Sequence, residues 1–111
     1  RCILLNTGWS GGPYGVGKRM SIGHTRALLN AALEGKLDGV ECEAHPIFNM
    51  KIPKSCPGVP SEVLNPKNTW KDKKAYDNAA RDVAQRFEKN FQQFESHVDD
   101  KVNKSAIRAA A

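Results

Sequence analysis

The most informative stretch of this sequence is Asn6-Thr7-Gly8-Trp9-Ser10-Gly11-Gly12-Pro13-Tyr14-Gly15-Val16-Gly17-Lys18-Arg19. A segment this rich in glycine is a loop, because glycine adopts conformations and close approaches that a β-carbon would block. Gly12 to Lys18 has the spacing G-x-x-x-x-G-K of a phosphate-binding loop. In such a loop the next residue is Ser or Thr, whose hydroxyl binds magnesium, but here it is Arg19. The spacing alone therefore does not indicate a working loop of that type.

Two cations, Lys18 and Arg19, follow the glycines just before a predicted helix. The planar guanidinium of an arginine can stack on an aromatic base or bind phosphate oxygens. Thr25 offers a short hydroxyl near the start of the helix. These residues are candidates for contacts with a nucleotide. From spacing alone, the favoured alternative is that Arg19 pairs with an unseen carboxylate and Thr25 helps to begin the helix.

Short elements are predicted on both sides of this loop. Residues 2–5 form an apolar run typical of a buried strand. A helix is predicted over 24–34, with an apolar face and with Gly35 placed to end it in a left-handed conformation. Residues 40–44 alternate apolar and charged side chains, as a half-exposed strand does.

The middle of the chain is predicted to be irregular. A long helix is excluded there by the prolines Pro46, Pro53, Pro57, Pro60 and Pro66. Within this segment, residues 47–48 and 50–52 are predicted to form short extended pieces.

A long helix is predicted over residues 73–98, with Asp72 as its N-cap. The pairs Asp77–Arg81 and Asp82–Arg86 have the i,i+4 spacing that stabilises a helix. One apolar stripe is drawn by Tyr76, Ala80, Val83, Phe87, Phe91, Phe94 and Val98. We expect this stripe to pack against the chain's own sheet rather than against a partner helix.

Composition excludes several classes of protein. The chain has 111 residues, of which 40% are hydrophobic and 26% charged, as in globular proteins. Its net charge of +5 raises the possibility of nucleic-acid binding, but acids and bases interleave in the last third, as on a solvated helix face. No apolar run approaches the roughly 20 residues that span a bilayer. We therefore expect neither nucleic acid nor membrane as a partner.

Cysteine and histidine usage indicates neither disulfides nor a metal site. None of Cys2, Cys42 and Cys56 forms a C-x-x-C unit, and His24, His45 and His97 are scattered singly. Without a secretory signal, reduced thiols and a cytoplasmic location are expected. The chain opens within an apolar run and without Met, so we interpret it as a piece of a longer protein.

Several ordered motifs point to a known family. Around the glycine loop these are Asn6-Thr7-Gly8-Trp9, Gly17-Lys18-Arg19, Ser21-Ile22 and Thr25-Arg26. Further along they are Pro46-Ile47-Phe48, Ile52-Pro53, Pro57-Gly58-Val59-Pro60, Leu64-Asn65-Pro66-Lys67-Asn68-Thr69-Trp70, and Tyr76 with its helix. In these residues the chain resembles the C-terminal part of ATP-dependent phosphoenolpyruvate carboxykinases. The resemblance covers nearly all of the chain except its last residues.

The resemblance implies a gluconeogenic enzyme that converts oxaloacetate and ATP to phosphoenolpyruvate, ADP and carbon dioxide. It implies that Arg19, Thr25 and the main chain of Met20 hold the adenine nucleotide. Family members also use Mg²⁺ with the nucleotide and Mn²⁺ at the substrate. Their phosphate loop, metal ligands and oxaloacetate-binding arginine lie upstream, so no catalytic or metal-binding residue is expected here. The expected partners are the remainder of the enzyme, oxaloacetate or phosphoenolpyruvate, and ATP or ADP.

The predicted fold is α/β: a C-terminal fragment of a mixed α/β nucleotide-binding domain, with short strands, a glycine-rich loop, one short helix and one long helix. Residues 1–104 are assigned to that domain, and residues 105–111 to a tail without a signal. The loop from Ser10 to Val16 is longer than in some bacterial members, which leaves open whether it is a lid, a packing element or a subunit contact. The alternative functions are a stand-alone nucleotide-binding module and a structural adaptor that uses Phe87, Phe91 and Phe94.

Overall fold

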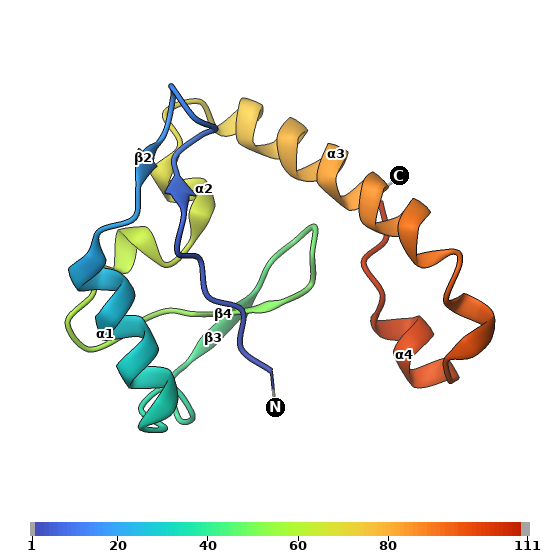
Figure 1. Cartoon of the computed structure of the whole chain (residues 1–111), viewed down its shortest axis with the longest axis horizontal. Helices are drawn as coiled ribbons and strands as arrows, with labels where there is room; N and C mark the ends of the chain where they lie inside the picture. Colours follow the sequence, from blue (N-terminus) through green and yellow to red (C-terminus); the bar gives the residue numbers. More distant parts are fainter. Residues whose placement is uncertain (1, 110–111) are drawn as a thin grey trace.

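Short strands and helices follow one another along the chain (Figure 1). The computed structural model describes residues 2–109. Arg1 and the last two residues of the predicted tail therefore lie outside the described residues. The elements are β1 Trp9–Ser10, β2 Lys18–Arg19, α1 Ile22–Leu33, β3 Cys42–Ala44, β4 Lys51–Pro53, the 3-10 helix η1 Ser61–Val63, α2 Pro66–Thr69, α3 Lys73–Phe91, the 3-10 helix η2 Glu95–His97 and α4 Asp100–Ser105.

The glycine-rich stretch forms the hairpin of a small antiparallel sheet. Trp9 of β1 is opposite Arg19 of β2, and the loop between the two strands contains positive φ angles at Gly11, Gly12 and Gly15. Left-handed conformations of this kind favour glycine. Residues 11–17 connect the two strands, and Trp9–Ser10, within the stretch predicted as loop, form one of them.

A second small sheet is made by β3 and β4, which pair antiparallel with Glu43 opposite Ile52. It confirms the strand predicted within residues 40–44 and the extended piece near residues 50–52. The extended piece predicted at residues 47–48 is wrong, because the chain turns there. Backbone N–H groups of that turn donate to the ring of His45 instead of to a neighbouring strand.

The strand predicted at residues 2–5 does not form. Within residues 2–109 no strand pairs with this segment, and a strand without a neighbour has no partners for its backbone groups. The side chains of Cys2, Ile3 and Leu4 are exposed. The prediction of a buried strand at residues 2–5 is therefore wrong.

The core of the chain is small and lies beside α1. Its buried members are Ala31, Leu37, Cys56 and Val59. Helix α1 begins after Ser21, whose side chain accepts a hydrogen bond from the N–H of His24. Gly35 follows its end with φ of 73°, as predicted for a glycine that terminates a helix.

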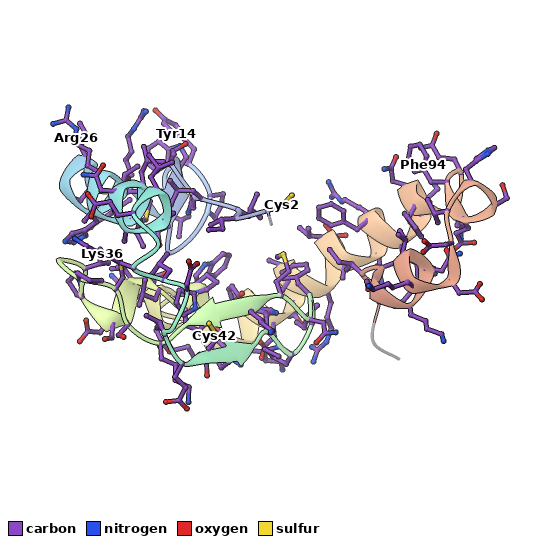
Figure 2. The ribbon with its side chains drawn as sticks, turned by 90° about the horizontal axis from the view of Figure 1, so that it is seen from below. Cys2, Tyr14, Arg26, Lys36, Cys42 and Phe94 are labelled. Carbon is purple, nitrogen blue, oxygen red and sulfur yellow. The ribbon has the colours of Figure 1, made fainter. Side chains whose placement is uncertain are left out.

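Helix α3 extends away from the two sheets, and Phe94 lies beyond its far end, remote from Cys42 (Figures 1 and 2). The radius of gyration is 15.3 Å, compared with about 13 Å for a compact domain of this length. Only the first half of the predicted stripe is buried, at Tyr76 and Ala80, whereas the Phe87 side chain is 50% exposed. The prediction that the stripe packs against the chain's own sheet is therefore wrong for its second half.

The helix predicted to reach residue 98 ends at Phe91. The chain then reverses through η2 and α4, so that the segment after α4 returns to α3 (Figure 1). There Arg108 forms an ion pair with Glu95 at 2.6 Å, and the backbone N–H of Ala109 donates to Glu88 at 3.0 Å. No helix in the described part of the chain is both long and apolar enough to cross a membrane.

Candidate functional site

A hollow lies between the β1–β2 hairpin and the turn that joins α2 to α3. Its volume is about 550 Å³, within the range of about 300–1,000 Å³ for small-molecule pockets. Its lining includes Lys18, Arg19, Met20, Trp70, Lys71 and Asp72. Two segments about fifty residues apart in sequence therefore form one site.

The hairpin and the turn fit closely at one glycine. A β-carbon added to Gly11 would lie 2.9 Å from the carbonyl oxygen of Thr69, which is too close for a side chain. Gly11 also has a φ of 84°, a conformation that side chains rarely adopt. This close contact sets the spacing of the two walls of the hollow.

Two of the three predicted nucleotide contacts line this hollow. Arg19 is exposed, and no carboxylate between residues 2 and 109 forms an ion pair with it. Met20 is half-buried, and its backbone N–H donates to the carbonyl of Gly8 at 2.7 Å. The alternative in which Arg19 pairs with a carboxylate therefore finds no partner within the described chain.

Thr25 is placed differently from the other two. It is not among the residues that line the hollow, and its hydroxyl donates to the carbonyl of Ser21 at 2.9 Å. This bond is a local contact within the first turn of α1, whose N-cap is Ser21. A contact between Thr25 and a nucleotide stays a prediction.

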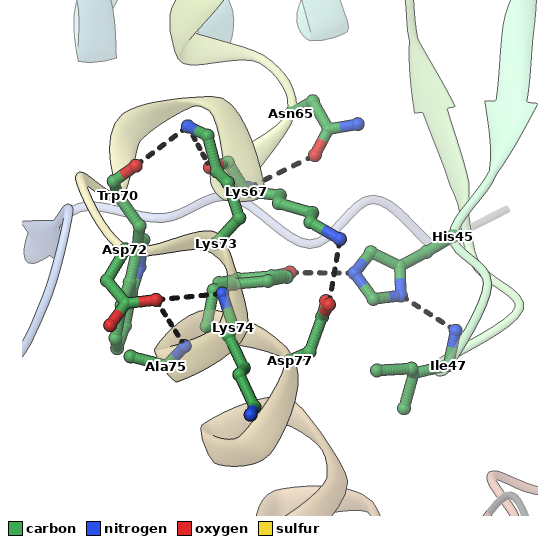
Figure 3. Close-up of polar contacts among 11 residues, drawn as sticks. His45, Ile47, Asn65, Lys67, Trp70, Asp72, Lys73, Lys74, Ala75 and Asp77 are labelled. Atoms are coloured by element: carbon green, nitrogen blue, oxygen red, sulfur yellow. Dashed lines mark hydrogen bonds and ion pairs between the residues drawn. The ribbon is translucent and has the colours of Figure 1, made fainter.

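The turn at residues 70–72 is held by its neighbours (Figure 3). The ammonium of Lys73 donates to the carbonyls of Lys67 at 2.9 Å, Asn68 at 3.3 Å and Trp70 at 2.7 Å. The carbonyl of Lys67 also accepts the backbone N–H of Trp70, so the ammonium adds a side-chain contact to the end of α2. Asp72 begins α3 by accepting hydrogen bonds from the backbone N–H groups of the next turn. Both sides of this turn are thus fixed by hydrogen bonds.

A buried histidine, His45, lies next to this site, although its isolated position in the sequence did not indicate a site. The His45 side chain is 5% exposed, and its Nε2 lies 2.7 Å from the hydroxyl of Tyr76 (Figure 3). Its Nδ1 accepts from the backbone N–H groups of Ile47 and Phe48, both at 3.1 Å. An accepting Nδ1 carries no proton, so Nε2 carries the proton and donates to Tyr76.

The environment of this pair favours the neutral form of both side chains. Burial lowers the pKa of His45, nearby Asp77 opposes that shift, and Lys67 adds to it. Burial also raises the pKa of the Tyr76 hydroxyl, with a further contribution from Asp77. The Tyr76 ring meets Trp70 edge-on, with centroids 5.6 Å apart. No spacing rule in the sequence points to this pair, whose members are 31 residues apart.

The described residues contain no group of three or more His, Cys, Asp or Glu side chains that could hold a metal ion. The residues present therefore do not fit the divalent cations that the family resemblance implies. All three cysteines are free, with Cys2 and Cys42 exposed and Cys56 buried. What the hollow offers is cationic side chains, an indole and backbone groups, which can bind a ligand and orient it.

Comparison with known proteins identifies the family. The model of the family described as phosphoenolpyruvate carboxykinase, ATP type, matches residues 1–62. A phosphoenolpyruvate carboxykinase (ATP) of Caldanaerobacter subterraneus subsp. tengcongensis is 61% identical over 94 residues, which are 85% of this chain and 18% of the relative. Proteins of the same name from Christiangramia forsetii and Geotalea uraniireducens are 53% and 56% identical, over 93% and 91% of this chain and 19% of each relative.

These matches define the chain at two levels. It is a small mixed α/β unit, with two antiparallel sheets and helices around them, that corresponds to part of a larger protein. It belongs to the ATP-dependent phosphoenolpyruvate carboxykinase family. The chain spans about a fifth of the length of the curated relatives that it matches.

Proposed function

We propose that this chain is part of an enzyme that converts oxaloacetate and ATP to phosphoenolpyruvate, ADP and carbon dioxide, and that it supplies part of the ATP site. Family membership and the names of the relatives support the reaction. The observation that carries the assignment of the site is the position of Arg19 and Met20 together in the wall of one hollow. The partners are then the remainder of the enzyme and its substrates.

In this proposal the chain contributes positioning and no catalytic residue. Loss of carbon dioxide from oxaloacetate leaves an enolate, whose oxygen attacks the γ-phosphorus of ATP while ADP departs. Phosphoryl transfer depends on holding the attacking and leaving oxygens in line. Arg19 stacks on the base or binds phosphate oxygens, and Met20 offers its main chain. Mg²⁺ and Mn²⁺ belong to residues elsewhere in the enzyme.

Steady-state kinetics of the complete enzyme test the assignment. Arg19→Ala removes a charged contact and should raise the KM for ATP about tenfold or more, since hydrogen bonds to charged groups contribute about 1.5–3 kcal/mol. Thr25→Ala should raise it less, because a neutral hydrogen bond contributes about 1 kcal/mol. The KM for oxaloacetate at saturating ATP should move little.

Arg81→Ala is the matched control, because Arg81 is an exposed arginine on α3 that does not line the hollow. Circular dichroism should show all three variants folded. Folded Arg19 and Thr25 variants with the ATP dependence of the wild type would contradict the proposal and leave both residues with structural roles only.

A further inference from the structure

We propose that the turn of residues 70–72 is the second wall of the nucleotide site, with Trp70 stacking against the base and Lys71 attracting the phosphates. This inference rests on the proposed function and extends it to two residues to which neither the sequence motifs nor the comparisons assign a role in nucleotide binding. It makes the site a clamp between two segments, the β1–β2 hairpin on one side and the α2–α3 turn on the other.

The first observation is the position and support of the indole. Trp70 lines the hollow together with Arg19 and Met20. It is half-buried and meets the ring of Tyr76 edge-on at an interplanar angle of 73°. Tyr76 is in turn held by His45. An aromatic ring fixed in this way at the wall of a pocket is a stacking surface for a base, because every base has a π-face.

The second observation is charge. The cations Lys18, Arg19 and Lys71 line the hollow and Asp72 is its one carboxylate, although one oxygen of Asp72 already caps α3. Within residues 2–109, Lys71 takes part in no ion pair. The occupant that complements an indole beside an excess of positive charge is planar at one end and anionic at the other. An adenine nucleotide has that form.

A second hollow in the same chain provides a contrast. It has a volume of about 460 Å³, and its charged lining residues are Asp38, Glu43 and Lys51. Acids outnumber bases there, and its lining contains no aromatic ring. The combination of cations with an indole therefore distinguishes the site at the hairpin from this second hollow.

The test uses the complete enzyme, with ATP as the probe. Trp70→Ala should raise the KM for ATP about tenfold, since a base stacked on an aromatic side chain contributes strongly to binding. Trp70→Phe should retain most of the affinity of the wild type for ATP, because it keeps an aromatic face. Lys71→Ala should raise the KM about threefold and make it less sensitive to salt, because it removes a screened attraction between charges.

Tryptophan fluorescence gives a readout that does not depend on catalysis. Addition of ATP should change the emission of the wild type, and Trp70→Phe should remove much of that change. Trp9→Phe is the matched control and should keep it, because Trp9 packs against Tyr14 and does not line the hollow. Equal ATP-induced changes in the two variants would overturn the inference, even if Trp70→Ala proved too unstable to assay.

The two proposals fail in different ways. If Arg19→Ala raises the KM for ATP while the Trp70 and Lys71 variants leave both KM and fluorescence unchanged, the turn has only a structural role and this inference is wrong. If Arg19→Ala also has no effect, the proposed function of the hollow fails with it.

Discussion

The Nε2 atom of His45 lies 2.7 Å from the hydroxyl oxygen of Tyr76, and this buried contact joins the end of β3 to the first turn of α3. It is the point at which the long helix meets the second sheet. The imidazole donates here through Nε2 and accepts two backbone hydrogen bonds through Nδ1, so only its neutral form satisfies all three contacts.

A pH-dependent stability follows from this contact. Burial holds the pKa of His45 below its usual value of 6.5 in the fold. The unfolded chain therefore binds more protons as the pH falls below that value. The contribution of His45 to the free energy of unfolding should be full above about pH 6.5 and should decline as the pH falls through the lowered pKa.

Unfolding in denaturant between pH 7.5 and pH 5 measures this effect. The difference in unfolding free energy between the wild type and His45→Gln should shrink as the pH falls. His97→Gln removes an exposed histidine and should leave the pH profile of the wild type intact. A constant difference across the range would contradict the neutral assignment of His45.

The second half of the apolar stripe on α3 is expected to be covered by other protein in the complete enzyme. Val83, Phe87 and Phe94 are all exposed within this chain. Contiguous apolar side chains of this kind mark a contact with other protein. In the complete enzyme Phe87→Ala should therefore cost about 3–5 kcal/mol of stability, as for a core phenylalanine.

Leu33→Ala is the control for this substitution, since Leu33 is 78% exposed and lies on α1 outside the stripe. It should change stability by less than about 0.5 kcal/mol. Similar small losses for the two variants, measured by thermal unfolding, would show that the stripe stays exposed in the enzyme.

The hairpin loop leaves no room for a side chain at Gly17. A β-carbon there would overlap the backbone carbonyl oxygens of Ser10 and Gly12, which cannot move independently of the loop. Gly17→Ala should lower stability by about 1–3 kcal/mol, the usual cost of overpacking. Gly39→Ala should be near neutral, since nothing lies within 4 Å of its added carbon. An equally stable Gly17→Ala enzyme would contradict the packing of this loop.

Asp72 both caps α3 and places a negative charge at the proposed site, and substitutions of this residue can distinguish the two roles. Asp72→Asn keeps a side-chain oxygen that can accept from the N–H groups of Lys74 and Ala75, so stability should change little. It also removes the one carboxylate that lines the hollow. The KM for ATP should therefore fall, by up to about fivefold for a loss of repulsion of about 1 kcal/mol. Asp72→Ala should lower the KM similarly but destabilise α3. An unchanged KM in both variants would argue against phosphate near this turn.

Local signals predicted where α3 begins and where α1 ends. Asp72 is the N-cap of α3, and Gly35 follows α1 in a left-handed conformation. Helix α1 begins at Ile22, two residues before the predicted start, because Ser21 is its N-cap. The end of α3 was misplaced because Phe94 and Val98 continue its periodicity through a turn and a 3-10 helix. The reversal there is stabilised by contacts such as Arg108 with Glu95, which local spacing does not encode.

The candidate site was predicted in part. The motif that includes Arg19 and Met20 lies in one hairpin, so neighbouring residues in the sequence stay neighbours in the structure. Trp70 and Lys71 meet that hairpin only through tertiary packing, which local sequence patterns do not encode.

The ion pairs of α3 were also predicted in part. Asp82–Arg86 is the one predicted ion pair that forms among the described residues, at 2.9 Å. Asp77 pairs instead with Lys67 of α2, at 2.9 Å. Pairing across elements depends on the fold, which spacing along one helix does not reveal.

The three carbonyl contacts of Lys73 have a consequence for the timing of events at the hollow. A turn already fixed before a ligand arrives has no slow rearrangement to complete after the encounter. The observed rate of ATP association should then rise in a straight line with concentration, without levelling off at the speed of a conformational step. The Lys73 ammonium group, which lies outside the hollow, would in this way determine whether ATP binds in one kinetic step or in two.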